Sequence, residues 1–162
     1  MWKQENKAAF LRCLNCMEQD AIVQHLKTFE HHGAATSRYD HSLLVAYLSF
    51  LFCRKYKMDY KAAARAGMLH DLFLEEWEGS ENGALSRWRT HPVEALQNAQ
   101  RYNLSAVESD IILKHMWPVT PDRPSYRESY VVSCADKVAA VLEKTRLSRA
   151  FGVQRNLHTF AQ

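Results

Sequence analysis

The sequence predicts an all-α protein. Apolar residues recur at helical spacing in each extended apolar segment, and no segment shows the period-two alternation of a half-buried strand. Helix-start signals, a Ser or Asp shortly before the apolar pattern, precede several of these segments. We therefore expect about six to eight helices of ordinary length, joined by short turns and one long loop.

Two amphipathic helices are expected first, over residues 3–16 and 20–29. In the second, apolar residues recur at helical spacing at Ile22, Val23, Leu26 and Phe29. Gly33 follows and is expected to cap the C-terminal end of this helix. The CxxC pair, Cys13 and Cys16, has no second pair nearby, so we interpret it as two ordinary thiols.

A long helix is expected next, opened by Ser37 with Asp40 three residues on, which resembles a capping box, and ending near Lys57. His41 shares its apolar face, so the imidazole is expected to point into the core. The residues that define this face are Leu44, Val45 and Leu48.

Asp59 is expected to cap a helix over residues 60–69, which places His70 and Asp71 at its C-terminal end. Residues 72–90 have little regular pattern, and we expect a long loop there that covers or binds something. The next helix is expected to start at His91-Pro92, with proline at the first helical position, and to end near Arg101.

Ser105 and Glu108 form a second capping box, which opens a short helix with His115 at its end. Three prolines, Pro118, Pro121 and Pro124, keep the next stretch extended.

Residues 125–128 (Ser-Tyr-Arg-Glu) are expected to cap the last long helix, which carries Asp136 on its apolar side and ends near Thr145. A short helix and tail are expected over residues 147–162.

The composition is that of an ordinary soluble protein. A chain of 162 residues, 47% hydrophobic and 24% charged, is most simply one domain. The net charge of +3 and the absence of a basic run give no reason to expect a nucleic-acid polymer, but a small anionic substrate is compatible with them. The longest apolar stretch, residues 43–53, is too short to span a membrane, which takes about 20 residues. Four Cys and no apolar leader fit the cytoplasm.

Six potential metal ligands fall at helix ends or on apolar helix faces: His41, His70, Asp71, His91, His115 and Asp136. Any one of these histidines could be an ordinary core residue, but all six together indicate a metal site. A buried, unpaired Asp136 would cost several kcal/mol, and a bound cation removes that cost. Imidazole and carboxylate donors suit zinc, iron, manganese and similar ions.

The order of these residues resembles the H…HD…D motif of the HD-domain superfamily of metal-dependent phosphohydrolases. The resemblance covers about residues 36–145 and implies a compact helical bundle, flanked by the helices over 3–29 and the segment 147–162. Locally, residues 39–43, 115–121 and 135–137 resemble a bacterial branch of small HD proteins.

The resemblance also implies roles for the six residues. His41, His70, Asp71 and Asp136 would hold one metal, and Asp71 would bridge to a second metal held by His91 and His115. The expected cofactor is therefore a divalent metal, in two ions, with iron, manganese, zinc, nickel or magnesium as candidates.

The implied reaction is hydrolysis of a phosphate ester or anhydride on a nucleotide or similar small metabolite, by a metal-activated water. Asp71 would act through the metals, and Lys137 and Arg38 are candidates to neutralise the phosphate. Arg89, Trp88 and Trp117 are candidates for substrate binding, the two tryptophans by stacking on a base.

Two other classes stay open: a mixed-valence di-iron oxygenase of the same superfamily, and a non-catalytic, metal-stabilised regulatory domain. Both a monomer and a homodimer are compatible with the sequence.

Overall fold

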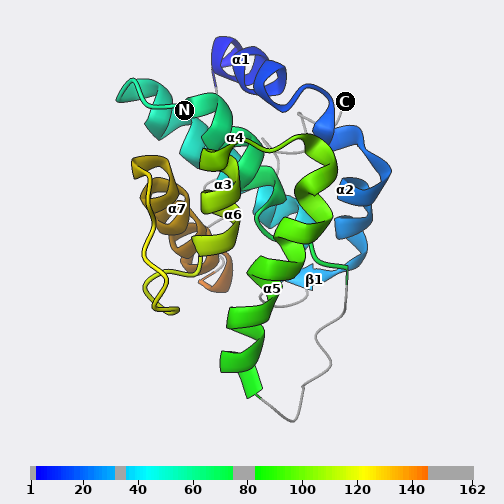
Figure 1. Cartoon of the computed structure of the whole chain (residues 1–162). Coiled ribbons are helices and arrows are strands. Elements are labelled where there is room, and N and C mark those ends of the chain that lie inside the picture. The colour runs from blue at the N-terminus through cyan, green and yellow to red at the C-terminus, as the bar shows by residue number, and fades with distance from the viewer. Residues whose placement is uncertain (1–2, 32–35, 75–82, 146–162) are drawn as a thin grey trace.

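The structure is a computed structural model that describes residues 3–31, 36–74 and 83–145 (Figure 1). The all-α prediction is confirmed, because this part contains seven α-helices and only one small β-ribbon. The helices are α1 (Gln4–Leu14), α2 (Ala21–His25), α3 (Arg38–Lys55), α4 (Tyr60–Leu69), α5 (Gly83–Ala99), α6 (Ala106–Lys114) and α7 (Arg127–Lys144). Short 3-10 turns cover Met17–Gln19, Leu26–Thr28 and Gln100–Tyr102.

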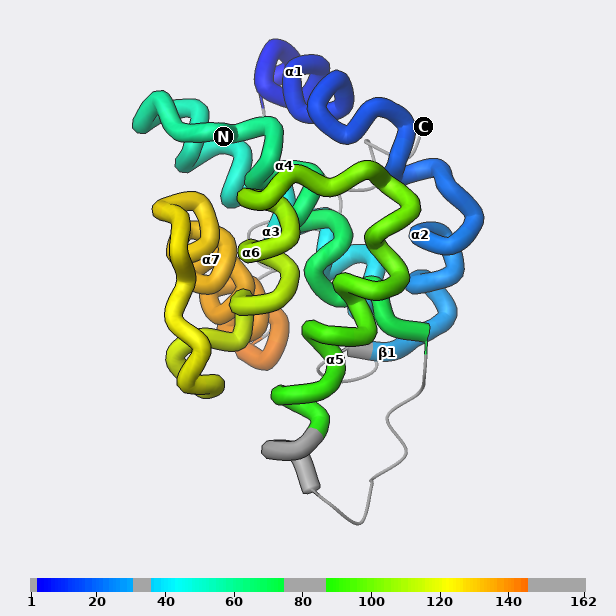
Figure 2. Tube along the Cα trace, in the orientation of Figure 1, coloured from blue at the N-terminus to red at the C-terminus, as the bar shows by residue number. Residues whose placement is uncertain are grey.

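The ribbon pairs β1 (Glu30–His31) with β2 (Thr36–Ser37) in antiparallel register, Glu30 opposite Ser37. Two residues per strand are too few to give an alternation signal in the sequence. The ribbon leads directly into α3, and the traces of Figures 1 and 2 show β1 below α2, from which the chain runs into it.

Helix α4 lies at the centre of the bundle, in contact with α1, α3, α6 and α7. Small side chains make this possible: the alanines at 62, 63, 64 and 66 are all buried. At Gly67 an added Cβ would lie 2.8 Å from Ala46 Cα on α3, so only glycine permits the observed approach of the two helices. The close packing holds the C-terminal end of α4, with its His-Asp pair, inside the protein.

Three predicted helix starts are confirmed. The Ser37 hydroxyl accepts from Asp40 N at 3.1 Å, and the Asp59 carboxylate accepts from Ala62 N at 2.9 Å. Ser105 and Glu108 form a complete capping box at the start of α6. Each cap satisfies main-chain donors that have no partner within the helix.

The predicted loop over 72–90 is wrong at its C-terminal end. Helix α5 begins at Gly83, so Pro92 lies inside the helix and not at its first position. A proline in the interior costs about 3 kcal/mol. Packing of α5 against α6 and α4 offsets that cost, and such packing leaves no mark in local sequence.

The predicted cap of α7 is also wrong, because Tyr126 is the N-cap and makes no side-chain cap bond. The groups expected to cap it have partners elsewhere: Ser125 Oγ accepts from Lys114 Nζ at 2.8 Å, and Glu128 Oε1 accepts from Asp59 N at 3.0 Å. Tertiary hydrogen bonds have replaced the local ones.

Several predictions fall outside the described residues, namely the cap at Gly33, the stretch 75–82 of the loop and the helix and tail over 147–162. Within the described ranges, no helix combines the length and the apolar character that a membrane span requires.

Candidate metal centre

The structure brings all six predicted ligands to one place. They come from five helices: His41 from α3, the His-Asp pair from the end of α4, His91 from α5, His115 from the end of α6 and Asp136 from α7. Two groups have donor atoms within 4.8 Å of one another, His41/His70/Asp71 and Asp71/His91/His115.

Three of the histidines have their Nδ1 atoms fixed by main-chain carbonyls. Nδ1 of His70 lies 2.7 Å from Gly67 O, that of His91 2.8 Å from Arg87 O, and that of His115 2.8 Å from Ile112 O. A carbonyl only accepts, so each Nδ1 carries the proton, and in the neutral ring Nε2 presents a lone pair. This is the tautomer that a metal-binding histidine needs.

These lone pairs converge. The Nε2 atoms of His91 and His115 lie 2.9 Å apart, and Asp71 Oδ1 lies 3.4 Å from the first and 3.6 Å from the second. For bonds of about 2.1 Å, neighbouring donors on one ion lie about 3.0–3.4 Å apart. The three atoms therefore have nearly the spacing of ligands to one ion.

The other carboxylate oxygen of Asp71 serves the first group. Asp71 Oδ2 lies 3.7 Å from His70 Nε2, and Asp136 Oδ1 lies 3.8 Å from the same nitrogen. Asp136 Oδ1 also lies 3.0 Å from His41 Nε2. Asp71 thus directs one oxygen to each group, which is the arrangement of a bridging ligand.

Two buried polar atoms support this interpretation. His70 Nε2 and Asp71 Oδ1 have no hydrogen-bond partner, although such atoms are almost always satisfied in folded proteins. A cation at each group would satisfy both, so the residues present fit divalent metal ions.

Two kinds of pKa shift occur among the ligands. Burial would lower the pKa of His41, but hydrogen bonds to Asp136 and Glu143 raise it to about 10, and the Asp71 carboxylate likewise raises the pKa of His70 against the effect of burial. A bound cation would therefore have to displace a proton at these two residues.

The shifts of Asp71 and His115 match the charge states that metal binding requires. Burial tends to raise the pKa of Asp71, but the surrounding imidazoles, His70 foremost, hold it well below its usual range. Burial and then the neighbouring His91 and His70 lower the pKa of His115 to about 3. The carboxylate is thus ionised and this imidazole neutral near neutral pH.

One residue of the centre was not predicted. Glu143 lies on α7 seven residues after Asp136, so both project from the same face of the helix. Its carboxylate accepts from Nδ1 of His41, at 3.0 and 3.1 Å for its two oxygens. The seven-residue spacing from Asp136 was the available signal.

A cavity of about 540 Å³ opens beside the centre. Four of the potential ligands line it, Asp71, His91, His115 and Asp136, together with four cationic side chains, Arg38, Arg87, Lys137 and Lys144. The remaining lining residues are Glu30, Phe73, Trp88, Met116, Val119 and Ala140.

Arg38 and Lys137 both line this cavity, but neither is a simple solvated cation. Arg38 is only 3% exposed, its guanidinium stacks on the rings of Phe29 and Phe73, and its Nη1 donates to Phe73 O. Burial lowers its pKa to about 10 despite the attraction of Asp71, so it stays charged. Lys137 Nζ donates to His115 O at 2.9 Å and to Ser133 O at 3.2 Å.

The other candidates for substrate binding are placed differently. Trp88 lines the cavity and is 36% exposed. Trp117 lies in a second hollow, beside Pro118 and Tyr130. Its ring packs edge-on against the ring of Tyr130. Arg89 is exposed on α5 and does not line the cavity. Roles for these three in substrate binding stay predictions.

The helical fold and the cluster of potential metal ligands agree with one known family. The sequence model of the HD-domain family matches residues 38–141, which is more than half of the chain. The chain belongs to the HD-domain family. No curated protein and no solved structure gave a match.

Proposed function

We propose that this protein is a metal-dependent phosphohydrolase that acts on a phosphate ester or anhydride of a nucleotide or similarly sized metabolite. The observation that carries the proposal is the position of Asp71, shared between two ligand groups at a cavity with cationic walls. Membership of the HD-domain family supports the same reaction class.

The ligand set suits ions that act on phosphate. Bound divalent ions would supply Lewis acidity toward phosphoryl oxygens and lower the pKa of a coordinated water. The protein's own contribution is to keep the donors in place: main-chain carbonyls fix three imidazoles, Asp136 comes from within α7, and Asp71 comes from the buried turn that follows α4. Little reorganisation would be needed when an ion binds.

The cationic wall suits an anionic group next to that centre. The side chains of Arg38 and Arg87 both lie against the ring of Phe73, at 3.6 and 4.6 Å from its centroid, although their charges repel. Arg87 is also paired with Glu94 at 3.0 Å. A phosphate between the metal centre and these guanidinium groups would reduce the repulsion and accept charge-assisted hydrogen bonds.

The remaining wall suits an organic group. Trp88, Met116 and Val119 offer apolar surface to the cavity, whose volume is within the range of small-molecule sites. With a base or sugar packed against Trp88, the phosphate of the same substrate would face Arg38 and Arg87. The proposed substrate is therefore a phosphorylated metabolite with a planar or apolar part.

The test is release of inorganic phosphate from nucleotides, sugar phosphates and a chromogenic phosphoester, with protein loaded separately with Mn²⁺, Fe²⁺, Zn²⁺, Ni²⁺ or Mg²⁺. We expect metal-dependent release that falls at least about 1,000-fold in Asp71→Asn. Asp122→Asn, which makes the same change at an exposed site, is the control and should retain full activity.

Two outcomes would reject the proposal. Substrate-dependent consumption of dioxygen without release of phosphate would assign the centre to the oxygenase class. If the wild-type protein is well folded and loaded with metal but releases no more phosphate from any of these substrates than Asp71→Asn does, a regulatory domain would be favoured.

A further inference from the structure

His41 differs from the other three histidines of the centre in what holds its Nδ1 atom. His70, His91 and His115 each donate Nδ1–H to a main-chain carbonyl. His41 instead faces the carboxylate of Glu143, with both oxygens at 3.0–3.1 Å. A carboxylate carries a full negative charge, whereas a carbonyl carries only a partial one.

Glu143 is well placed for this contact and poorly placed for a direct role in binding an ion. Its side chain is 3% exposed and lies on the Nδ1 side of the His41 ring. His41 Nε2 faces the centre from the opposite edge of the ring, 3.0 Å from Asp136 Oδ1. One ion cannot contact Nε2 and also lie near the oxygens at Nδ1, so Glu143 acts through His41.

Helix α7 supplies both carboxylates that hold His41. Asp136 and Glu143 are two turns apart on one face, and the imidazole from α3 lies between them. The HD-domain match ends at residue 141, so Glu143 lies outside the matched range.

We propose that Glu143 is a positioning residue that makes the first metal site, His41/His70/Asp71/Asp136, bind a divalent ion more tightly than the second. Its carboxylate fixes the His41 tautomer and adds negative charge behind the ring, which makes Nε2 a stronger donor. Among the described residues, the second site draws on the shared Asp71 carboxylate and two imidazoles held by carbonyls. This inference depends on the metal-binding part of the proposed function and not on the hydrolysis.

The first experiment measures binding of Mn²⁺ to chelator-treated protein by calorimetry, with no substrate present. Wild type should bind in two steps whose dissociation constants differ at least about 10-fold. His91→Ala should lose the weak step and keep the tight one. Two equal steps, or a single step, in the wild type would overturn the inference.

The decisive variants separate charge from hydrogen bonding. Glu143→Gln keeps an acceptor for Nδ1–H but removes the charge, and we expect the tight step to weaken about 10- to 100-fold while the weak step changes little. Glu143→Ala removes both and should weaken the tight step further. Glu5→Gln, the same change on the exposed face of α1, is the matched control and should bind as wild type does.

A purely structural role for Glu143 is distinguished by spectroscopy. The visible spectrum of one Co²⁺ equivalent, which occupies the tighter site, should shift in Glu143→Gln and not in Glu5→Gln. The circular dichroism spectra of the metal-free wild type, Glu143→Gln and Glu5→Gln should be the same, which would show that the variants fold as the wild type does. Equal weakening of both steps, or an unchanged tight step and Co²⁺ spectrum, would show that Glu143 does not tune the first site. Neither result depends on whether the protein hydrolyses phosphate.

Discussion

The Nε2 atoms of His91 and His115 lie 2.9 Å apart while both Nδ1 atoms donate to main-chain carbonyls. Two neutral imidazoles in these tautomers place lone pairs against each other in a buried site. The pair is therefore unfavourable in the metal-free protein and becomes favourable when a cation is bound between the nitrogens and Asp71.

His115→Ala tests this relationship. We expect the bound metal to fall by about one ion per chain and the stabilisation by added metal to shrink, since a ligand present at 100 times its dissociation constant contributes about 2.7 kcal/mol. Elemental analysis and thermal unfolding with and without chelator would measure both. The control is His25→Ala, an exposed histidine on α2. An unchanged metal content in His115→Ala would remove this residue from the site.

Gly67→Ala tests the close contact of α3 with α4. Alanine would favour the helix by about 1 kcal/mol, but its Cβ would lie 2.8 Å from the Cα of Ala46. We expect a net loss of about 1–3 kcal/mol in urea unfolding, because main-chain atoms must move apart. Lys61→Ala, at an exposed position of α4, should change stability by less than about 0.5 kcal/mol. A more stable Gly67→Ala variant would contradict the packing.

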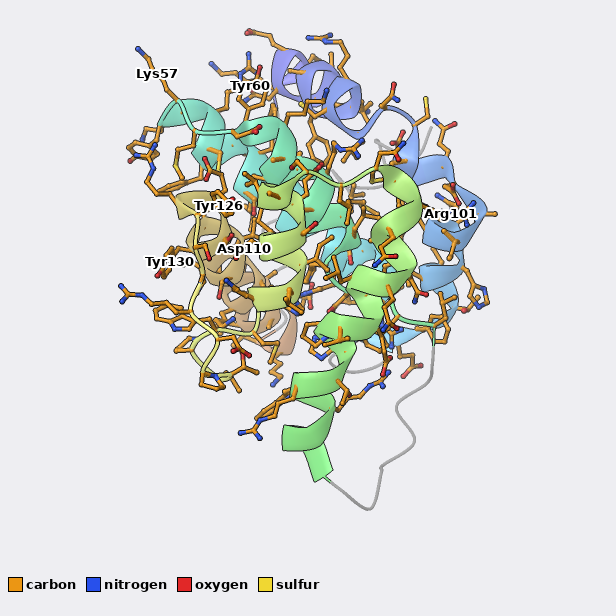
Figure 3. The ribbon with its side chains drawn as sticks, viewed as in Figure 1. Lys57, Tyr60, Arg101, Asp110, Tyr126 and Tyr130 are labelled. Carbon is orange, nitrogen blue, oxygen red and sulfur yellow. The ribbon has the colours of Figure 1, made fainter. Side chains whose placement is uncertain are left out.

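Asp110→Asn tests the junction between α6 and the start of α7. Asp110 Oδ2 accepts from Ser129 Oγ at 2.7 Å and from Ser125 N at 3.0 Å, and it ties α6 to the start of α7 near Tyr126 and Tyr130 (Figure 3). Burial alone would raise its pKa, but the Lys114 ammonium and these hydrogen bonds lower it. We expect Asp110→Asn to cost about 1 kcal/mol near neutral pH.

The pH dependence follows from the direction of that shift. The pKa of Asp110 is lower in the folded protein than its usual 3.8, so its contribution to the free energy of unfolding is complete at pH values above 3.8. The contribution is lost as the pH falls through the folded-state pKa, so the stabilities of wild type and Asp110→Asn should converge in acid. Urea unfolding at several pH values would measure this. A constant difference down to the acid transition would contradict it.

Trp88→Ala tests the proposed orientation of a nucleotide substrate. Base–aromatic stacking is worth about 1–3 kcal/mol, so we expect KM for a nucleotide to rise about 10-fold or more with a smaller change in kcat. KM for a sugar phosphate should not change. Trp117→Ala is the matched control, because its ring lies in the second hollow. The reverse pattern, a rise only in Trp117→Ala, would place the base elsewhere.

Much of the metal centre could be predicted because its ligands follow local rules. A His-Asp pair at a helix end and imidazoles on apolar faces are visible in the sequence, and the structure brings five of the six residues into two donor groups, with Asp136 beside His41 and His70. Glu143 was missed since its role depends on the register of α7 against α3, which only the tertiary structure fixes. Its spacing from Asp136 was visible, but nothing local distinguished it from a solvated glutamate.

The errors in the fold have the same origin. The predictions for Pro92 and for the cap of α7 used rules for isolated helices, and in both places contacts with other helices decide the structure. Arg38 likewise lies between two aromatic rings, from Phe29 and Phe73, that are distant from each other in the sequence. The local sequence indicates which segments form helices, but it does not indicate which side chains of other helices they contact.

The most direct test of a dinuclear centre is elemental analysis of protein purified anaerobically without added metal, expressed as ions per chain. We expect about two divalent ions in the wild type, about one in His91→Ala, and loss of both in Asp71→Ala, since Asp71 serves both groups. A folded wild-type protein that retains no metal, and takes up none when Mn²⁺, Fe²⁺ or Zn²⁺ is offered, would contradict it.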